Sequence, residues 1–224
     1  MRKGEEKRQE LLNAAEKLFC QQGYEKTSVQ DILGVTGLSK GGFYHHFAGK
    51  DEVLAALCSR RTERAAAYTA EALNQAGSPM GRINAVLRGF MPLRREEAEF
   101  MGILLPVICM PEGRGAAMMY QDALEADFIP LLRAEIATAA AVQVVFPPVK
   151  DMEGVVLNTV NHAWITVAAA MAAAKEKGQR LEPAACLALL EKYRRAIELL
   201  LDAPFGSIEI LRVEEIEEVN RLIG

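Results

Sequence analysis

The sequence predicts an all-α protein, in which a small N-terminal three-helix domain precedes a larger helical body. Apolar residues recur at helical spacing along most of the chain. Alanine is abundant and aromatic residues make up only 6% of the chain, a composition that favours helices. The one strand-like candidate, residues 142–149, is short and runs into two prolines. We place the domain boundary after residue 50, which gives domains 1–50 and 51–224.

The first two helices are predicted from apolar spacing and from capping residues. A helix over residues 5–22 is expected to end at Gly23, because glycine often follows the last residue of a helix. Its apolar positions follow the i, i+3, i+4, i+7 pattern and are Leu11, Leu12, Ala15, Leu18 and Phe19. A short second helix is predicted over residues 28–33. The Thr27 hydroxyl is expected to cap it, with Gln30 reaching back to complete a capping box.

A third helix is predicted after a turn at Gly37. Ser39 is the expected N-cap of this helix, and Phe43 and Phe47, four residues apart, share the face that we expect to be buried. A long helix over residues 51–76 then follows. The rest of the chain is predicted to form further helices, over residues 79–91, 96–109, 114–141, 151–177, 182–202 and 207–223.

The bulk composition sets limits on the class of protein. No signal peptide or membrane-spanning run is visible, and the four cysteines form no CxxC pair, so we expect a cytoplasmic protein with reduced thiols. The net charge of −4 argues against nucleic-acid binding by the whole chain. The charge is uneven, however: residues 1–60 hold nine Lys or Arg and eight Asp or Glu, a net +1, while the remainder holds 17 and 22, a net −5.

Two short helices joined by a glycine-containing turn and preceded by a supporting helix form a helix-turn-helix unit. In such units the later helix enters the major groove of DNA. Thr27 and its helix N-terminus are placed to bind a phosphate, and Lys40 stands at the front of the third helix. The Tyr44 hydroxyl can reach the DNA backbone, and Lys50 stands at the start of the next helix.

The segment "TSVQDILGVTGLSKGGFYHHFAGKDEVL" resembles the DNA-binding segment of the TetR/AcrR family of bacterial transcriptional regulators. The resemblance covers residues 8–57. It implies an all-α homodimer with a DNA reader and a ligand-binding body in each subunit, whose last helices pair into a four-helix bundle. It also implies a DNA-facing set, which is Thr27, Ser39, Lys40, Gly41, Gly42, Tyr44, His45, His46 and Lys50.

Within that set we assign roles by side-chain chemistry. Lys40 and His45 are expected to contact DNA bases. Contacts to DNA phosphates are expected from Thr27, Tyr44, His46 and Lys50. Gly42 departs from the family pattern, because many relatives carry a side chain there, and it leaves base reading to its neighbours. A metal site at His45 and His46 is disfavoured, since adjacent helical residues point about 100° apart; no metal or cofactor is expected.

The body offers a less specific set of candidate ligand-binding residues. The set combines apolar walls with a few polar groups, as binding pockets do, and comprises Phe90, Phe100, Met101, Met118, Tyr120, Asn158, His162 and Trp164. Ordinary core packing is the alternative reading for these residues. Helices over residues 151–177 and 182–202 are expected to pair with a second copy. The segment 207–223 is amphipathic and packs on the body or the dimer partner, or docks another protein.

These observations favour a ligand-responsive transcriptional regulator. We expect a repressor that binds a palindromic operator, as a dimer on double-stranded DNA, and that a small, mostly apolar effector releases. A redox-sensing regulator that acts through a cysteine is one alternative, and a helical enzyme is another. The sequence holds no GxGxxG after a strand, GxxxxGK[ST], HExxH or GxSxG motif, which disfavours the enzyme.

Overall fold

The computed structural model describes residues 3–91 and 114–223, and these residues are helical with no strand. The predicted helix over residues 96–109 lies outside this part of the chain. The described residues divide into two compact units: residues 3–62 with 114–123, and residues 63–91 with 124–223. The all-α prediction is therefore confirmed, while the domain boundary after residue 50 stays a prediction. None of the described helices is long and apolar enough to cross a membrane.

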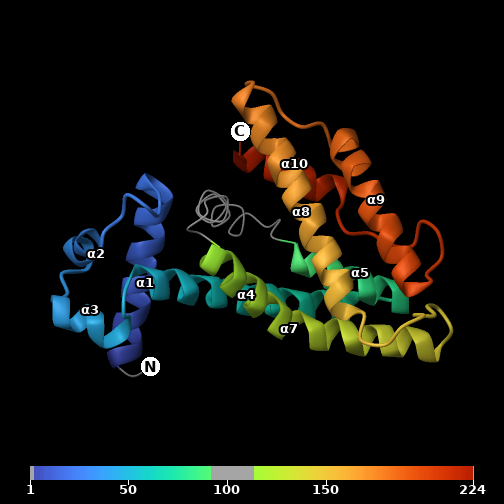
Figure 1. Cartoon of the computed structure of the whole chain (residues 1–224), viewed down its shortest axis with the longest axis horizontal. Coiled ribbons are helices and arrows are strands. Elements are labelled where there is room, and N and C mark those ends of the chain that lie inside the picture. The colour runs from blue at the N-terminus through green and yellow to red at the C-terminus, as the bar shows by residue number, and fades with distance from the viewer. Residues whose placement is uncertain (1–2, 92–113, 224) are drawn as a thin grey trace. The chain divides into compact units, whose positions relative to one another are not determined.

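The first unit contains the three predicted N-terminal helices. They are α1 (Lys3–Gln22), α2 (Val29–Thr36) and α3 (Lys40–His46), and α4 (Lys50–Gln75) begins in the same unit (Figure 1). Phe43 and Phe47 are 0% and 1% exposed, and Ile32 is fully buried with them in the core of this unit. The prediction that the two phenylalanines are core residues is confirmed. Their burial stabilises a helix as short as α3, which would not form alone.

The predicted cap of α2 is wrong by one residue. Ser28 is the N-cap: its hydroxyl accepts a hydrogen bond from the Asp31 backbone N–H at 3.2 Å, and the Asp31 carboxylate accepts one from the Ser28 N–H at 2.7 Å. The capping box is thus Ser28–Asp31 and not Thr27–Gln30. The Thr27 hydroxyl instead faces the turn before α2, where it donates to the Gly23 carbonyl at 2.8 Å and accepts from the Gln22 amide at 3.3 Å.

The second helix is also longer than predicted. It continues through Gly34 to Thr36 and ends at Gly37, which adopts a left-handed conformation with φ of 66°. The Gly37 N–H donates to the Leu33 carbonyl at 2.8 Å and closes the helix. Gly34 does not break α2, since an isolated glycine costs a helix only about 1 kcal/mol relative to alanine.

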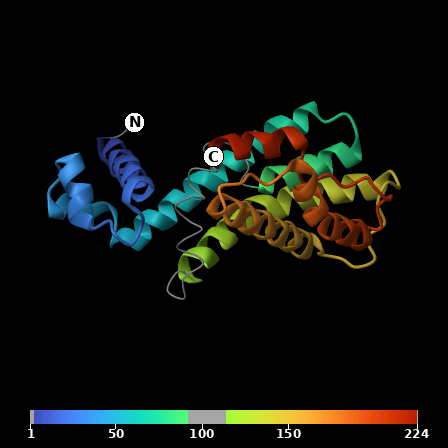
Figure 2. The same ribbon diagram turned by 90° about the horizontal axis from the view of Figure 1, so that it is seen from above.

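The second unit contains the later helices. They are α5 (Pro79–Phe90), α7 (Arg114–Ala141, which begins in the first unit), α8 (Glu153–Glu176), α9 (Pro183–Leu201) and α10 (Val213–Ile223). Helices α8 and α9 pack along each other and lie side by side in both views (Figures 1 and 2). Helix α5 packs on α8, and α10 packs on α9. The core of this unit holds large apolar side chains, among them Phe128, Leu132, Leu157, Trp164 and Ile197.

The C-terminal helix begins six residues later than predicted, at Val213. The preceding residues form no helix, because both Ile208 and Ile210 are 2% exposed and thus alternate toward the core with a period of two. The Asn84 side chain on α5 holds this segment: it donates to the Ser207 carbonyl at 2.8 Å and accepts from the Glu209 N–H at 3.0 Å.

A buried carboxylate fixes the turn that leaves α9. Glu198, whose side chain is 0% exposed, pairs with Arg194 at 2.5 Å and with Arg195 at 3.1 Å. It also accepts a hydrogen bond from the Gly206 N–H at 2.7 Å. The turn needs such support because Asp202 and Gly206 both have positive φ, 46° and 79°.

Candidate nucleic-acid interface

Helix α3 presents a short polar face opposite its buried phenylalanines. The Ser39 hydroxyl caps it by accepting from the Gly42 N–H at 3.1 Å, as predicted. Lys40, Tyr44 and His45 are exposed, and Tyr44 lies one helical turn after Lys40. The side chains assigned to DNA therefore stand on the solvent side of α3, where a major groove could receive them.

The glycine pair at the front of α3 is not required by packing within the chain. A Cβ atom at Gly41 would meet nothing within 4 Å, and one at Gly42 would meet the Ser39 hydroxyl at 3.4 Å, an ordinary contact. Packing among the described residues therefore gives no reason for either glycine. A reason on the outer side, such as close approach of the α3 backbone to a ligand, agrees with this geometry.

The two adjacent histidines contact each other. Their ring centroids lie 5.1 Å apart, with the rings edge to face. His45 is exposed and His46 is half-buried. In the part of the chain that the structure describes, no three His, Cys, Asp or Glu side chains gather as a metal site would require.

Thr27 lies inside the turn that leads into α2. It is 1% exposed, donates its hydroxyl to Gly23 and accepts from the Gln22 amide at 3.3 Å. Its assigned phosphate contact stays a prediction, and its hydroxyl already serves the turn. Ser28, Gln30 and Asp31 are exposed at the start of α2, and none of them was assigned to the interface from sequence. The S-x-x-D spacing from Ser28 to Asp31 was the signal that could have identified this end of the helix.

Lys50 lies at the first position of α4 and bonds back to the turn between α1 and α2. Its Nζ donates to the Tyr24 carbonyl at 2.9 Å and to the Glu25 carbonyl at 3.4 Å. The ammonium also lies 4.3 Å from the centroid of the Tyr24 ring. Sequence reasoning missed Tyr24, because a contact across 26 residues has no local signature.

The residues predicted to bind a ligand in the body are not gathered into a described cavity. Phe90 is buried and packs edge-on against Phe128, with centroids 5.4 Å apart. Met118 is 65% exposed, and Tyr120 is half-buried. Phe100 and Met101 lie outside the described residues.

The three predicted residues on α8 differ in environment. Asn158 is exposed and donates to Glu125 at 3.3 Å. His162 is also exposed, with its Nδ1 at 2.9 Å from the Asn158 carbonyl. Trp164 is 5% exposed, and its indole N–H has no acceptor among the described residues. A buried donor without an acceptor is unusual enough to require an explanation.

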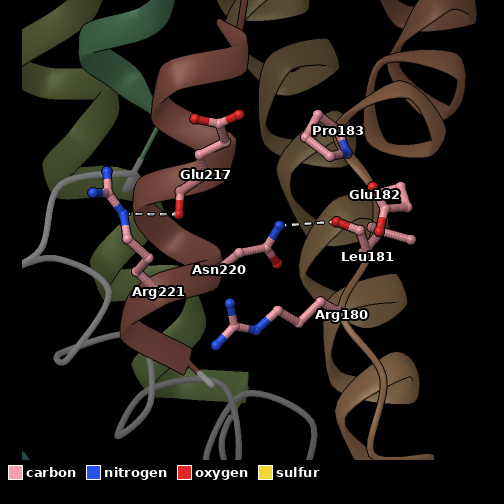
Figure 3. A pocket seen from close by; sticks show the side chains of 7 residues that line it. All are labelled: Arg180, Leu181, Glu182, Pro183, Glu217, Asn220 and Arg221. Atoms are coloured by element: carbon pink, nitrogen blue, oxygen red, sulfur yellow. Dashed lines mark hydrogen bonds between the residues drawn. The ribbon is translucent and has the colours of Figure 1, made fainter.

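A separate groove of about 370 Å³ lies between α10 and the segment that leads into α9 (Figure 3). The Asn220 amide crosses it and donates to the Leu181 carbonyl at 2.8 Å. Arg180 and Arg221 also line it, but in this view the Arg221 guanidinium lies on the far side of α10 from Arg180. The two cations do not converge on one point in this view, and no predicted ligand residue lines the groove.

Comparison with known proteins places these N-terminal helices in a family. The family model for bacterial regulatory proteins, tetR family, matches residues 11–57, which run from α1 into α4. This chain belongs to the TetR family. The HTH-type transcriptional repressor Rv1474c of Mycobacterium tuberculosis is 38% identical over 61 residues, which are 27% of this chain and 33% of that protein. The match thus spans about a third of the length of this curated relative.

Solved structures extend the likeness of this TetR-family protein to the whole fold. A putative TetR-family transcriptional regulator from Syntrophomonas wolfei superposes with a TM-score of 0.60 at 18% identity, covering 86% of this chain and 95% of that one. Salmonella enterica GusR superposes with a TM-score of 0.58 at 18% identity, covering 88% and 95%. At this identity the likeness concerns the fold alone. An N-terminal helix-turn-helix domain followed by a larger helical domain is the shared architecture.

Proposed function

We propose that this TetR-family protein is a DNA-binding transcriptional regulator that represses its target genes. It binds a palindromic operator as a homodimer, and a small, mostly apolar effector releases it. The family match at residues 11–57 and the repressor named among its relatives support DNA binding. The operator, the dimer and the effector are inferred from the features described next.

The observation that carries the proposal is the solvent-facing side of α3. Lys40 and His45 project from it without a hydrogen bond or ion pair among the described residues. Lys40 offers a cation to a base edge or phosphate, and His45 offers a ring nitrogen to a base edge. The Tyr44 hydroxyl supplies a backbone contact from the same helix.

Exposed apolar side chains on α8 and α9 support the homodimer. Val155 and Ile165 on α8 are 53% and 43% exposed, and Leu187 and Leu199 on α9 are 38% and 62% exposed. Covering such side chains with a second copy would remove apolar surface from water. A dimer also suits a palindrome, because two recognition helices about 34–36 Å apart meet successive major grooves on one side of the duplex. A monomer in sedimentation at micromolar concentration would contradict this part of the proposal.

The indole N–H of Trp164, which has no acceptor among the described residues, supports an effector site in the body. An effector that carries a hydrogen-bond acceptor would satisfy this buried N–H, while apolar side chains around it would hold the rest of the molecule. Such an effector weakens DNA binding only as far as it binds one conformation of the dimer better than the other.

The direct test is binding of the purified protein to a fluorescent duplex from the region upstream of its own gene, at several salt concentrations. Affinity should fall as salt rises, because each phosphate contact releases a counterion. Lys40→Ala should weaken binding by about fivefold to a hundredfold, the effect of losing one base contact of about 1–3 kcal/mol. Lys177→Ala, the same change at an exposed position beyond α8, is the matched control and should bind as the wild type does. Salt-independent binding, or no binding to any palindrome, would contradict the proposal.

The effector site has its own measurement, since Trp164 is the single tryptophan of the chain. A compound that fills a site beside its indole should change the tryptophan emission and raise the melting temperature of the protein. The same compound should release the duplex. A compound that releases DNA without changing the emission would place the effector elsewhere.

A further inference from the structure

Among the described residues, only uncharged groups hold the Lys50 ammonium. Its ammonium is bound by the carbonyls of Tyr24 and Glu25 and faces the Tyr24 ring at 4.3 Å. It forms no ion pair with a described residue, although Asp51 is its neighbour in sequence. An ammonium has three N–H donors, so one donor remains after the two carbonyls.

Tyr24 also binds one oxygen of Asp51, the carboxylate next to Lys50 in the sequence. The Tyr24 hydroxyl donates to Oδ1 of Asp51, and burial together with this bond raises the pKa of Tyr24 well above its ordinary value. The tyrosine therefore remains a protonated donor, and the carboxylate of Asp51 stays with it. Tyr24 thus contacts the first two residues of α4. Its hydroxyl binds Asp51, and its ring and carbonyl bind Lys50.

The Tyr24 side chain is itself fixed. It is 7% exposed, and its ring packs edge-on against Phe19 of α1 with centroids 5.1 Å apart. Its carbonyl also accepts from the Thr27 N–H at 3.2 Å, within the turn that ends at the Ser28 cap of α2. All of these residues belong to the first unit, so the arrangement is internal to the DNA-binding domain.

We propose that Tyr24 is a positioning residue for DNA binding, which holds the Lys50 ammonium in place and keeps it free of Asp51 so that its remaining N–H donates to a DNA phosphate. The inference rests on the proposed DNA-binding function. Tyr24 itself touches no DNA in this scheme and acts through Lys50. A purely structural role, in which Tyr24 and Lys50 only fasten the turn to α4, is the competing explanation.

The test is a double-mutant cycle read out by DNA affinity and by its salt dependence. Lys50→Met removes the charge. The plot of log affinity against log salt has a negative slope, and this variant should make it less steep by about one, the value for one lost phosphate contact. Tyr24→Leu removes the ring and the hydroxyl, and should weaken binding by about fivefold to tenfold, in line with a cation–π contact and an oriented cation. In the Lys50→Met background, Tyr24→Leu should have little further effect on affinity.

Tyr24→Phe is the mild variant in case the leucine variant folds poorly. It keeps the ring over Lys50 and releases Asp51. The freed carboxylate then competes with the DNA phosphate for the Lys50 ammonium, so the salt dependence should weaken toward that of Lys50→Met. Circular dichroism and melting temperature verify that each variant is folded. Rescue of the slope by Asp51→Asn in the Tyr24→Phe background would tie the loss to the freed carboxylate.

Additive losses of affinity with an unchanged salt slope in all variants would overturn the inference and leave the structural role. That result can be obtained only if the wild type binds DNA, so the proposed DNA-binding function would stand. A wild-type protein that binds no DNA would instead contradict the proposed function itself.

Discussion

A Cβ atom placed on Gly89 of α5 would lie 1.8 Å from the hydroxyl oxygen of Thr69 on α4. Thr69 is 0% exposed, and its hydroxyl donates to the Ala65 carbonyl at 2.7 Å, which fixes its side chain. The two helices approach at this point only because residue 89 has no side chain. Gly89 is therefore a packing residue.

Gly89→Ala should destabilise the second unit. The methyl group must displace Thr69 or separate the helices, and overpacking of this kind costs about 1–3 kcal/mol, more than the helix-propensity gain of about 1 kcal/mol. Urea or thermal unfolding measures the loss. Gly154→Ala is the matched control, because a Cβ atom there would meet nothing within 4 Å. Equal stability of the two variants would show that α4 and α5 can move apart without a loss in the free energy of unfolding.

Ser28→Ala should destabilise the first unit through loss of the α2 cap. A lost serine cap costs about 1 kcal/mol. Gln30→Ala should leave the stability within about 0.5 kcal/mol, because Gln30 is exposed and takes no part in the observed capping box. Thermal unfolding of the two variants separates the observed cap from the Thr27–Gln30 cap expected from sequence. A larger loss for Gln30→Ala would favour the latter.

The carboxyl of Asp31 should titrate below its ordinary range. The Ser28 hydroxyl and N–H both donate to the charged form, and these bonds lower the pKa of Asp31. The stabilisation from this depressed pKa is present above the ordinary pKa of an aspartate and is lost as the pH falls through the lower value in the folded state. An NMR titration in Ser28→Ala should show the pKa of Asp31 moving part of the way up, since the backbone N–H remains. An unmoved value would remove the hydroxyl from the explanation.

The N-terminal helices, α3 among them, could be predicted from sequence because their signals are local. Apolar spacing located α1 and α3, and Ser39 caps the helix that was assigned to it. The errors arose where two local signals competed. Both T-x-x-Q and S-x-x-D stand at the start of α2; the observed box is Ser28–Asp31, and the Thr27 hydroxyl bonds within the preceding turn.

The remaining errors depend on contacts between distant parts of the chain. Residues 207–212 have an amphipathic pattern that also suits a helix, but Asn84, more than a hundred residues earlier, binds this backbone in an extended form. Likewise Thr27 and Lys50 have the residue types of phosphate ligands, and only the fold places Thr27 inside a turn and Lys50 over Tyr24. A single sequence carries no local mark of either contact.

Removal of the Glu198 carboxylate should destabilise the body. Glu198→Ala leaves Arg194 and the Gly206 N–H without their shared buried acceptor. Arg194 keeps Glu191 as a partner, so the main loss is the acceptor of the Gly206 N–H, which costs about 1–3 kcal/mol. Glu191→Ala removes the exposed partner of the same arginine and should cost less than about 1 kcal/mol. Chemical denaturation compares the two, and similar losses would mean that the turn after α9 is held by other contacts.

The thiols of Cys58 and Cys186 should be unreactive in the folded protein, which bears on the alternative of a redox-sensing regulator. They are 1% and 0% exposed, and burial raises the pKa of Cys58 to about 12 and that of Cys186 to about 11. The thiolate is the reactive form, so at pH 8 only about one molecule in a thousand or fewer would carry it at either position. Cys20, in contrast, is exposed.

Reaction with a disulfide reagent such as DTNB checks this prediction in a Cys109→Ser background, where only these three thiols report. One thiol should react fast in the native state, and Cys20→Ser should abolish that phase. The other two should react only at the rate at which the protein opens, and denaturant should make them react at once. Rapid native labelling of Cys58 or Cys186 would contradict their burial and would make a cysteine-based sensor a serious alternative to an effector that binds non-covalently.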